Sequence, residues 1–325
     1  MHPALSTSEG VSNDMTRTLV IGGCGFIGSH IVDKLLERGH LVRVLDMRPE
    51  LYRLPLLGVE YVMGSFCDEA TLEAALQDVD SVVHTASTTV PSTANLDPIH
   101  DIGTNLISTV RLLQVMREKS IKRLVFLSSG GTVYGIPQAD MVTEDHPQNP
   151  ISSYGIVKLA IERYLHMEQH LHGLEYVALR ASNPYGPRQG QLGLQGIIGN
   201  YLWKVSKGEQ IEVWGDGSII RDFIHVQDLA ELAALTVKAP ICGFFNAGSG
   251  QGTSVNQIVS LTAKVTGQNL QPIYKPGRGF DVPRIILDIT RIRQATDWSP
   301  VITLEEGFRD SWNWIHHHKQ VSAVA

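Results

Sequence analysis

The segment Leu19-Val20-Ile21-Gly22-Gly23-Cys24-Gly25-Phe26-Ile27-Gly28 decides the fold. Its first three residues form an apolar run typical of a buried strand, and from Phe26 to Arg38 apolar residues recur at helical spacing. The glycines between them allow a tight turn and a close approach of the backbone to a pyrophosphate at the start of the helix. We therefore predict a dinucleotide-binding turn, whose contact residues are Gly22, Gly25, Phe26, Ile27 and Gly28.

The next apolar run, residues 41–45, ends in Asp46, eighteen residues after Gly28. A carboxylate at this place hydrogen-bonds the adenosine ribose and repels a 2′-phosphate, so it selects NAD over NADP. Arg48 lies close enough in the sequence to soften that preference. A glycine-rich turn that serves packing alone is the alternative interpretation, and the acid makes it the weaker one.

The remaining chain alternates short apolar runs with amphipathic stretches, which predicts a parallel, doubly wound α/β sheet of the Rossmann type. Further strands are expected at 61–62, 81–83, 124–127 and 176–179, and helices at 72–76, 106–116, 154–170 and 304–317. Residues 182–194 are rich in Gly, Pro and Gln and indicate a loop. We expect a disordered tail at 1–16, an NAD-binding domain at 17–181 with a returning segment at about 219–250, and a smaller α+β substrate lobe at 182–218 and 251–325.

Composition excludes several classes of protein. A net charge of −6 and the lack of a Lys/Arg run disfavour nucleic acid as a partner. No run of about 18 apolar residues predicts a membrane span. Three scattered cysteines without a CxxC pair disfavour a disulfide framework or a zinc site, and they fit the cytoplasm. Three histidines, at 316–318, follow the last helix, where a solvated turn is commoner than a metal site, so we expect no metal.

Tyr154 and Lys158 lie four residues apart at the start of a predicted helix, and therefore on one face. A phenol with a pKa near 10 is a poor base at neutral pH, and a nearby cation lowers that pKa. Elsewhere such a pair would more often be an exposed surface pair. Because it follows a dinucleotide-binding fold, we predict that Tyr154 is a catalytic base and that Lys158 supports it.

Together with these residues, a series of further motifs is similar to the extended short-chain dehydrogenase/reductases of the NAD-dependent epimerase/dehydratase family. The resemblance covers residues 18–314 and is closest to the UDP-glucose (UDP-galactose) 4-epimerases. The matching segments are His84-Thr85-Ala86, Asn105, Ser128-Ser129-Gly130-Gly131-Thr132-Val133-Tyr134-Gly135, 179–187, Gly215-Asp216-Gly217, 221–226, 245–250 and 278–281.

The resemblance implies NAD as the cofactor, a UDP-sugar as the substrate and a homodimer that pairs through helices near 106–116 and 154–170. It places the cofactor against Ser65, Phe66, Thr85, Ala86, Ser87, Asn105, Ser128, Tyr154 and Lys158, in addition to the glycine turn and Asp46. It places the substrate against Ser129, Thr132, Asn183, Asn200, Arg221, Arg278 and Asp281. Guanidinium groups suit the diphosphate because they form bidentate, charge-assisted bonds to phosphate oxygens. Ile285 matches the residue that limits the size of the hexose pocket.

Two departures from the family pattern bear on the reaction. The usual serine or threonine four residues before Tyr134 is replaced by Gly130, so we expect Thr132, or else Ser129, to contact the substrate hydroxyl. Dehydratases of the family carry an Asp-Glu pair where Gly131 and Thr132 stand here, and decarboxylases carry a Glu at the second place. We therefore expect C4 epimerisation of a UDP-hexose; a dehydratase, decarboxylase, reductase or non-catalytic dinucleotide-binding scaffold is the alternative.

Overall fold

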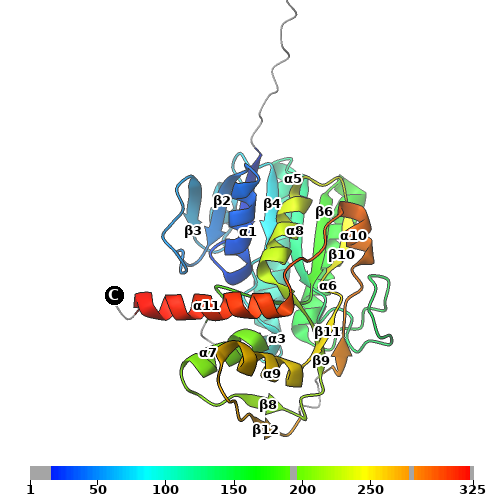
Figure 1. Ribbon diagram of the computed structural model, residues 1–325. Coiled ribbons are helices and arrows are strands. Elements are labelled where there is room, and N and C mark those ends of the chain that lie inside the picture. The colour runs from blue at the N-terminus through cyan, green and yellow to red at the C-terminus, as the bar shows by residue number, and fades with distance from the viewer. Residues whose placement is uncertain (1–15, 191–195, 278–281, 323–325) are drawn as a thin grey trace, which may run out of the picture.

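The computed structural model describes residues 16–190, 196–277 and 282–322, and its centre is a seven-stranded sheet (Figure 1). All neighbouring strands are parallel, in the order β10-β6-β5-β4-β1-β2-β3. The strands are β1 (Arg17–Ile21), β2 (Leu41–Asp46), β3 (Val59–Met63), β4 (Ser81–His84), β5 (Arg123–Ser129), β6 (Glu175–Ala181) and β10 (Gly243–Ala247). The doubly wound α/β fold predicted from the sequence is confirmed.

Successive side chains along each strand point to opposite faces of the sheet. Both faces are apolar, and each is covered by helices. On β1, Val20 packs toward one face, whereas Leu19 and Ile21 pack toward the other. The first face is covered by α1 (Phe26–Glu37), α8 (Val226–Lys238) and α10 (Thr290–Thr296). The second face is covered by α2 (Glu69–Ala75), α5 (Ser108–Glu118) and α6 (Ser153–His172). Both layers bury the central strands almost completely, which explains their nearly continuous apolar sequences, whereas the edge strand β3 stays partly exposed.

The order of the strands reverses between β1 and β4, because the chain moves from β1 outward to β2 and β3 before it returns to β4. In open α/β sheets, ligands bind at such a switch point, beyond the carboxyl ends of the strands. The glycine turn follows β1, and residues 85–87 follow β4. The topology therefore brings two predicted cofactor-binding segments to one edge of the sheet.

A smaller set of elements lies below the sheet domain in Figure 1. Its helices are α7 (Ile197–Ser206), α9 (Val255–Thr266) and α11 (Leu304–Ser322), which share one apolar cluster. Its strands are β7 (Asn183–Tyr185), β9 (Ile220–His225), β11 (Gly252–Ser254) and β13 (Arg284–Ile285) in one sheet, and β8 (Glu212–Trp214) and β12 (Ile273–Lys275) in another. The proposed division into domains at these segments stays a prediction.

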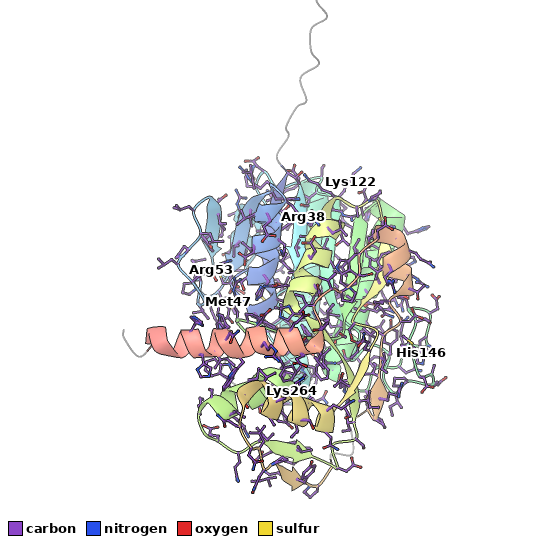
Figure 2. The ribbon with its side chains drawn as sticks, viewed as in Figure 1. Arg38, Met47, Arg53, Lys122, His146 and Lys264 are labelled. Carbon is purple, nitrogen blue, oxygen red and sulfur yellow. The ribbon has the colours of Figure 1, made fainter. Side chains whose placement is uncertain are left out.

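Ion pairs join neighbouring helices on the surface. Arg38 of α1 contacts Glu231 of α8, and Lys264 of α9 lies 2.6 Å from Glu305 of α11 (Figure 2). Exposed pairs of this kind contribute at most about 1 kcal/mol each. The apolar clusters, rather than these pairs, therefore hold the helices in place.

The structure differs from the sequence-based prediction in four segments. The helix expected at 106–116 begins earlier, as α4 (Pro98–Asp101) and a π-helical segment η1 (Ile102–Ile107) that continues into α5. The predicted loop 182–194 contains β7, which forms because it pairs with β9, a partner far away in the sequence. The tail helix extends from the predicted His317 to Ser322. A short helix, α3 (Pro91–Ala94), was not predicted.

Among the residues the structure describes, no helix is both long enough and apolar enough to cross a membrane.

Candidate active site

The glycine turn packs so tightly that side chains do not fit in it. A Cβ atom on Gly28 would lie 2.1 Å from the carbonyl oxygen of Gly22, and one on Gly22 would lie 2.8 Å from the backbone nitrogen of Ala86. Gly22 also has a φ of +84°, which glycine adopts without strain. The turn thus brings α1 against the ends of β1 and β4. The N-cap, Gly25, makes no side-chain cap bond, so the first N–H groups of α1 are available to an anion.

Asp46 is held beside this turn by two backbone donors. Its Oδ2 accepts a hydrogen bond from Cys24 N at 3.0 Å, and its Oδ1 accepts one from Arg48 N at 3.1 Å. Each oxygen retains a further lone pair, which a ribose hydroxyl could use. Cys24 itself is unreactive, because burial, followed by the charge of Asp46, raises the pKa of its thiol to about 12.

The segment after β4 lies at the same edge of the sheet as the glycine turn. Thr85 Oγ1 donates to Ile21 O at 2.8 Å, and Ser87 Oγ donates to Thr89 O at 2.9 Å. On the neighbouring segment, Ser65 Oγ accepts from Cys67 N at 3.1 Å. The Phe66 ring is buried against His84 with 5.1 Å between the ring centroids, so its side chain belongs to the core. The glycine cradle, the free helix N-terminus and the held acid together fit a dinucleotide with unphosphorylated ribose.

Tyr154 and Lys158 occupy the first turns of α6, as predicted. Ser152 begins this helix by accepting a hydrogen bond from Gly155 N at 3.2 Å. Lys158 Nζ donates to Leu127 O at 2.8 Å and lies 5.6 Å from the centroid of the Tyr154 ring. Burial lowers the pKa of Lys158 to about 8, although Asp101 and Glu162 oppose the shift. The lysine is thus still largely charged at neutral pH.

The phenol of Tyr154 differs from expectation, because its pKa is raised rather than lowered. Burial, followed by the charge of Asp101, raises the pKa of Tyr154 to about 12, and a hydrogen bond with Ser87 opposes the shift. The ammonium group of Lys158 donates to the Leu127 carbonyl, and it does not offset the effect of burial on the pKa of Tyr154. A group of positive charge bound in front of the phenol is therefore needed before the phenolate forms near pH 7.

The segment after β5 explains the glycine found at position 130. A Cβ atom there would lie 2.5 Å from Leu287 Cδ1 and 2.8 Å from the carbonyl oxygen of Arg180, so no serine fits without displacement. Thr132 Oγ1 is buried and has no hydrogen-bond partner. The carbonyl of Thr132 packs directly against Gly155, next to Tyr154. The orphaned hydroxyl of Thr132 is therefore the better placed of the two predicted substitutes.

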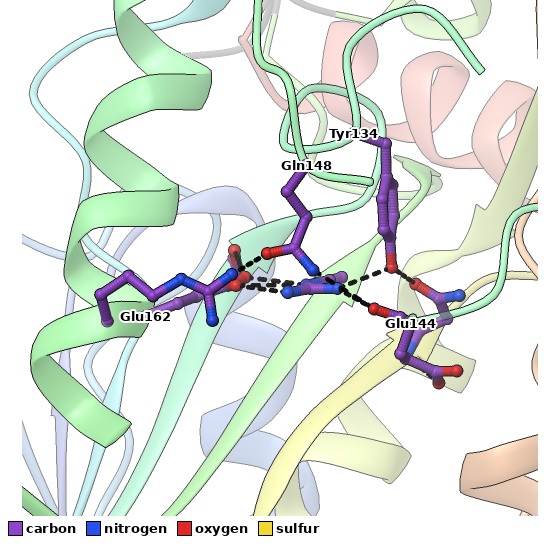
Figure 3. Close-up of polar contacts among 8 residues, drawn as sticks. Tyr134, Glu144, Gln148 and Glu162 are labelled. Carbon is purple, nitrogen blue, oxygen red and sulfur yellow. Dashed lines mark hydrogen bonds and ion pairs between the residues drawn. The ribbon is translucent and has the colours of Figure 1, made fainter. Parts of the chain in front are cut away.

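A buried network behind the site connects α6 with the sheet (Figure 3). Arg180 on β6 is 0% exposed and donates through Nη2 to Glu162 Oε2 at 2.7 Å and through Nη1 to the Tyr134 hydroxyl at 3.0 Å. Ser128 Oγ donates to Glu162 Oε1 at 2.6 Å, so this hydroxyl, predicted to contact the cofactor, is used within the protein. Sequence reasoning did not identify Glu162, whose only signal was a place two turns after Tyr154.

The Tyr134 hydroxyl extends the network to the returning strand. It donates to Asn246 Oδ1 on β10 at 2.6 Å, and Asn246 N donates to Glu144 Oε1 at 2.8 Å. Burial alone would lower the pKa of Arg180, but its hydrogen bonds and charge interaction with Glu162 raise it. The guanidinium is consequently a permanent buried cation that fixes α6, β6 and β10 relative to one another.

The predicted substrate residues divide between the two parts of the fold: Ser129 ends β5 and Thr132 follows it, whereas Asn183, Asn200 and Arg221 lie on the smaller set of elements. Asn183 Nδ2 donates to Asp222 O at 2.8 Å, and Arg221 Nη1 donates to Ile220 O at 2.9 Å. Asn200 is half-buried on α7. Arg278 and Asp281 fall outside the described residues. Neighbouring Asp222, which was not predicted, is buried and accepts from Ser249 and Leu287, so it shapes the loop beside Arg221.

Comparisons with known proteins find relatives that match nearly the whole chain. The model of the NAD dependent epimerase/dehydratase family matches residues 18–248. The UDP-glucose 4-epimerase of Mycolicibacterium smegmatis is 34% identical over 94% of this chain and 100% of its own. The crystal structure of UDP-glucose 4-epimerase from Thermotoga maritima with UDP-glucose has a TM-score of 0.89 at 33% identity and covers 94% of this chain and 100% of its own.

A complex of Thermus thermophilus UDP-glucose 4-epimerase with NAD has a TM-score of 0.86 at 32% identity, over 93% of this chain and 99% of its own. The similarity therefore extends across both the sheet domain and the smaller elements below it. This chain carries the glycine turn, the acid and the Tyr-Lys pair, and its relatives match it over nearly its whole length. It belongs to the NAD dependent epimerase/dehydratase family.

Proposed function

We propose that this protein inverts the C4 configuration of a UDP-hexose through a 4-keto intermediate, with NAD as a bound cofactor. The observation that carries the proposal is the convergence of Tyr154, Lys158 and the unpartnered Thr132 hydroxyl at the carboxyl edge of the sheet, beside the dinucleotide cradle. Curated relatives that match nearly the whole chain are UDP-glucose 4-epimerases, which supports the same reaction.

The roles of the side chains follow from their chemistry. Tyr154, as the phenolate, removes the proton from the C4 hydroxyl, and Thr132 hydrogen-bonds that hydroxyl. Lys158 keeps a positive charge beside the phenol and suits the hydroxyls of a ribose. NAD, held by the glycine turn and Asp46, would supply the acceptor and donor of the C4 hydride and a positive charge at the active site.

The smaller lobe anchors the nucleotide in this proposal. Arg221 and Arg278 hold the diphosphate, while Asn183 and Asn200 contact the same part of the substrate. The sugar is then free to turn about its bond to the diphosphate between the two hydride transfers. Gly131 and Thr132 stand where dehydratases carry acids, so the proton at C5 has no base.

A panel of UDP-glucose, UDP-N-acetylglucosamine and UDP-glucuronate, with products identified by NMR, tests the reaction. We expect the C4 epimer of at least one of these sugars, with transient absorbance near 340 nm as the cofactor is reduced. A 4-keto-6-deoxy or decarboxylated product without a C4 epimer would replace the proposal with one of the alternatives. No product and no absorbance change would favour a non-catalytic scaffold.

We also propose that two copies pair through α5 and α6. On α6, Ile156, Tyr164, Met167 and Leu171 form a stripe at helical spacing, and all are exposed. Ile107, 55% exposed, adds to the same side from the adjoining helix. Apolar patches of this kind mark protein interfaces.

Sedimentation velocity of Ile156→Glu tests this pairing. We expect a dimer for the unmodified chain and a monomer for the variant, because a charge at an apolar interface is left unpaired. Leu57→Glu is the matched control, since Leu57 is 100% exposed on the loop between β2 and β3 and should leave the dimer intact. A variant that sediments like the unmodified chain would contradict the assignment of the interface.

A further inference from the structure

A π-helical turn borders the active site and brings two polar side chains inward. Asp101 ends α4, Asn105 lies four residues later in η1, and their exposed fractions are 0% and 5%. π-helical turns are rare and are frequently found at functional sites. The buried Glu162 on α6 is paired with Arg180, whereas no cation forms an ion pair with Asp101 among the described residues, so its burial at this turn requires an explanation.

Three segments of the chain donate hydrogen bonds to the Asp101 carboxylate. Thr89 Oγ1, in the segment after β4, lies 2.7 Å from Oδ1, and Asn105 Nδ2 lies 2.9 Å from the same oxygen. Ser153 Oγ, at the first residue of α6, lies 2.7 Å from Oδ2. Within residues 16–190, 196–277 and 282–322, no Lys, Arg or His forms an ion pair with Asp101. Its hydrogen bonds thus come from neutral donors, and burial of a carboxylate in such surroundings is costly for a purely structural residue.

Both ends of Tyr154 connect to this carboxylate. The backbone of Tyr154 directly follows Ser153, which donates to Asp101. Ser87, which lowers the pKa of the phenol, donates its hydroxyl hydrogen to the carbonyl of Thr89, and Thr89 donates to Asp101 in turn. Asn105 Oδ1 completes the arrangement by accepting from Thr88 N at 3.0 Å.

We propose that Asp101 is a positioning residue that fixes Tyr154 at the reacting carbon and acts on the Tyr154–Lys158 pair through its buried negative charge. The proposal rests on the proposed function only in taking Tyr154 as the base. Asn105, predicted to contact the cofactor, has its side-chain amide bound to Thr88, Thr89 and Asp101, so it assists this positioning.

The charge of Asp101 affects both members of the pair. After burial, it is the largest contribution that raises the pKa of Tyr154, and it opposes the lowering of the Lys158 pKa by burial. The other groups that face the pair are Ser87 after β4, His84 on β4 and Glu162 on α6. Removal of the Asp101 charge should therefore lower the pKa of the phenol and that of the amine together.

Asp101→Asn tests this charge, because asparagine keeps the size of the side chain and an acceptor for Thr89. We expect both limbs of the pH profile of kcat/KM to move to lower pH by about one unit, since each pKa falls. Asp97→Asn is the matched control: Asp97 is exposed at the N-cap of α4, and asparagine caps a helix equally well. We expect both limbs of the pH profile of Asp97→Asn to stay where they are in the unmodified chain. Limbs that also stay in place in Asp101→Asn would overturn the proposal.

A second measurement does not depend on turnover. In NAD-loaded protein with tyrosine labelled by ¹³C at the ring ζ carbon, the Tyr154 resonance is assigned by its loss in Tyr154→Phe. We expect its titration midpoint to be lower in Asp101→Asn than in the unmodified chain. Equal titration midpoints of Tyr154 in the two proteins would overturn the proposal, and so would the lack of any titration while both proteins stay folded. This test holds even if the substrate panel yields no product.

Ser153→Ala separates the geometric part from the charge. This change removes one hydrogen bond to Asp101 without altering any charge, so we expect kcat to fall about tenfold through misplacement of the phenol, with both limbs unmoved. It also keeps the proposal testable if Asp101→Asn does not fold. A Ser153→Ala variant with unchanged kcat would overturn the positioning role.

Discussion

Tyr154→Phe should lower kcat by a factor of about 10³, because a positioned acid–base group contributes about 10² to 10⁴ to the rate. The substitution removes only the phenolic oxygen. The ring keeps its place near Lys158 Nζ, 5.6 Å from the ring centroid in the unmodified chain, so the fold of α6 should not change. Single-turnover kinetics with the substrate identified by the sugar panel would measure the effect.

The same variant should retain its cofactor. The glycine turn and Asp46 lie on β1, α1 and β2, away from the phenol, and they are expected to carry most of the affinity for NAD. Measurement of bound NAD after purification is the control. A variant that turns over at an unchanged rate would exclude Tyr154 as the base, whereas loss of both NAD and activity would indicate a structural defect instead.

Arg180→Met should destabilise the fold by about 3–5 kcal/mol, since removal of one member of a buried ion pair leaves the other charge uncompensated. Arg180 and Glu162 both have fully buried side chains, and Ser128 would be the remaining donor to Glu162 among the bonds described above. The Tyr134 hydroxyl and the carbonyl of Glu144 would each lose a donor as well. Thermal unfolding followed by circular dichroism would show a clearly lower Tm.

Two further variants separate the charge effect from simple loss of packing. Adding Glu162→Gln to Arg180→Met removes the unpaired charge, so the double variant should be more stable than Arg180→Met alone. Arg163→Met is the matched control: Arg163 is exposed on the same helix and contacts only Gln148 and the Phe244 ring among the contacts described, so its stability should change by no more than about 1 kcal/mol. A double variant less stable than Arg180→Met would mean that the buried charge is not the cause.

The candidate cofactor turn and the proposed Tyr-Lys pair could be found in the sequence because their residues are local. Gly22, Gly25 and Gly28 lie within seven residues, and Tyr154 and Lys158 are one helical turn apart. Asp46 ends the next strand, and parallel strands end at one edge of a sheet. Residues so close along the chain have a fixed relation once the element type is known.

The contacts among distant segments were decided only by the tertiary structure. β7 forms because β9 pairs with it, and the helix before α5 begins eight residues early because its π-helical turn interrupts the regular apolar spacing. Only the structure shows that the Thr132 hydroxyl is buried without a hydrogen-bond partner, and that the Thr132 carbonyl packs against Gly155 of α6. Periodicity reports which face of an element is apolar, and it carries no information on which buried polar groups meet.

The sequence by itself determined that this protein has a parallel α/β sheet with a glycine turn, an acid suited to NAD and a Tyr-Lys pair on one helical face. Only the tertiary structure showed that burial and Asp101 raise the pKa of Tyr154, and that Arg180 and Glu162 hold α6 in place. The physical reason is that hydrogen-bond partners and desolvation depend on side chains separated by 18 to 53 residues in the chain, such as Glu162 with Arg180 and Asp101 with Tyr154.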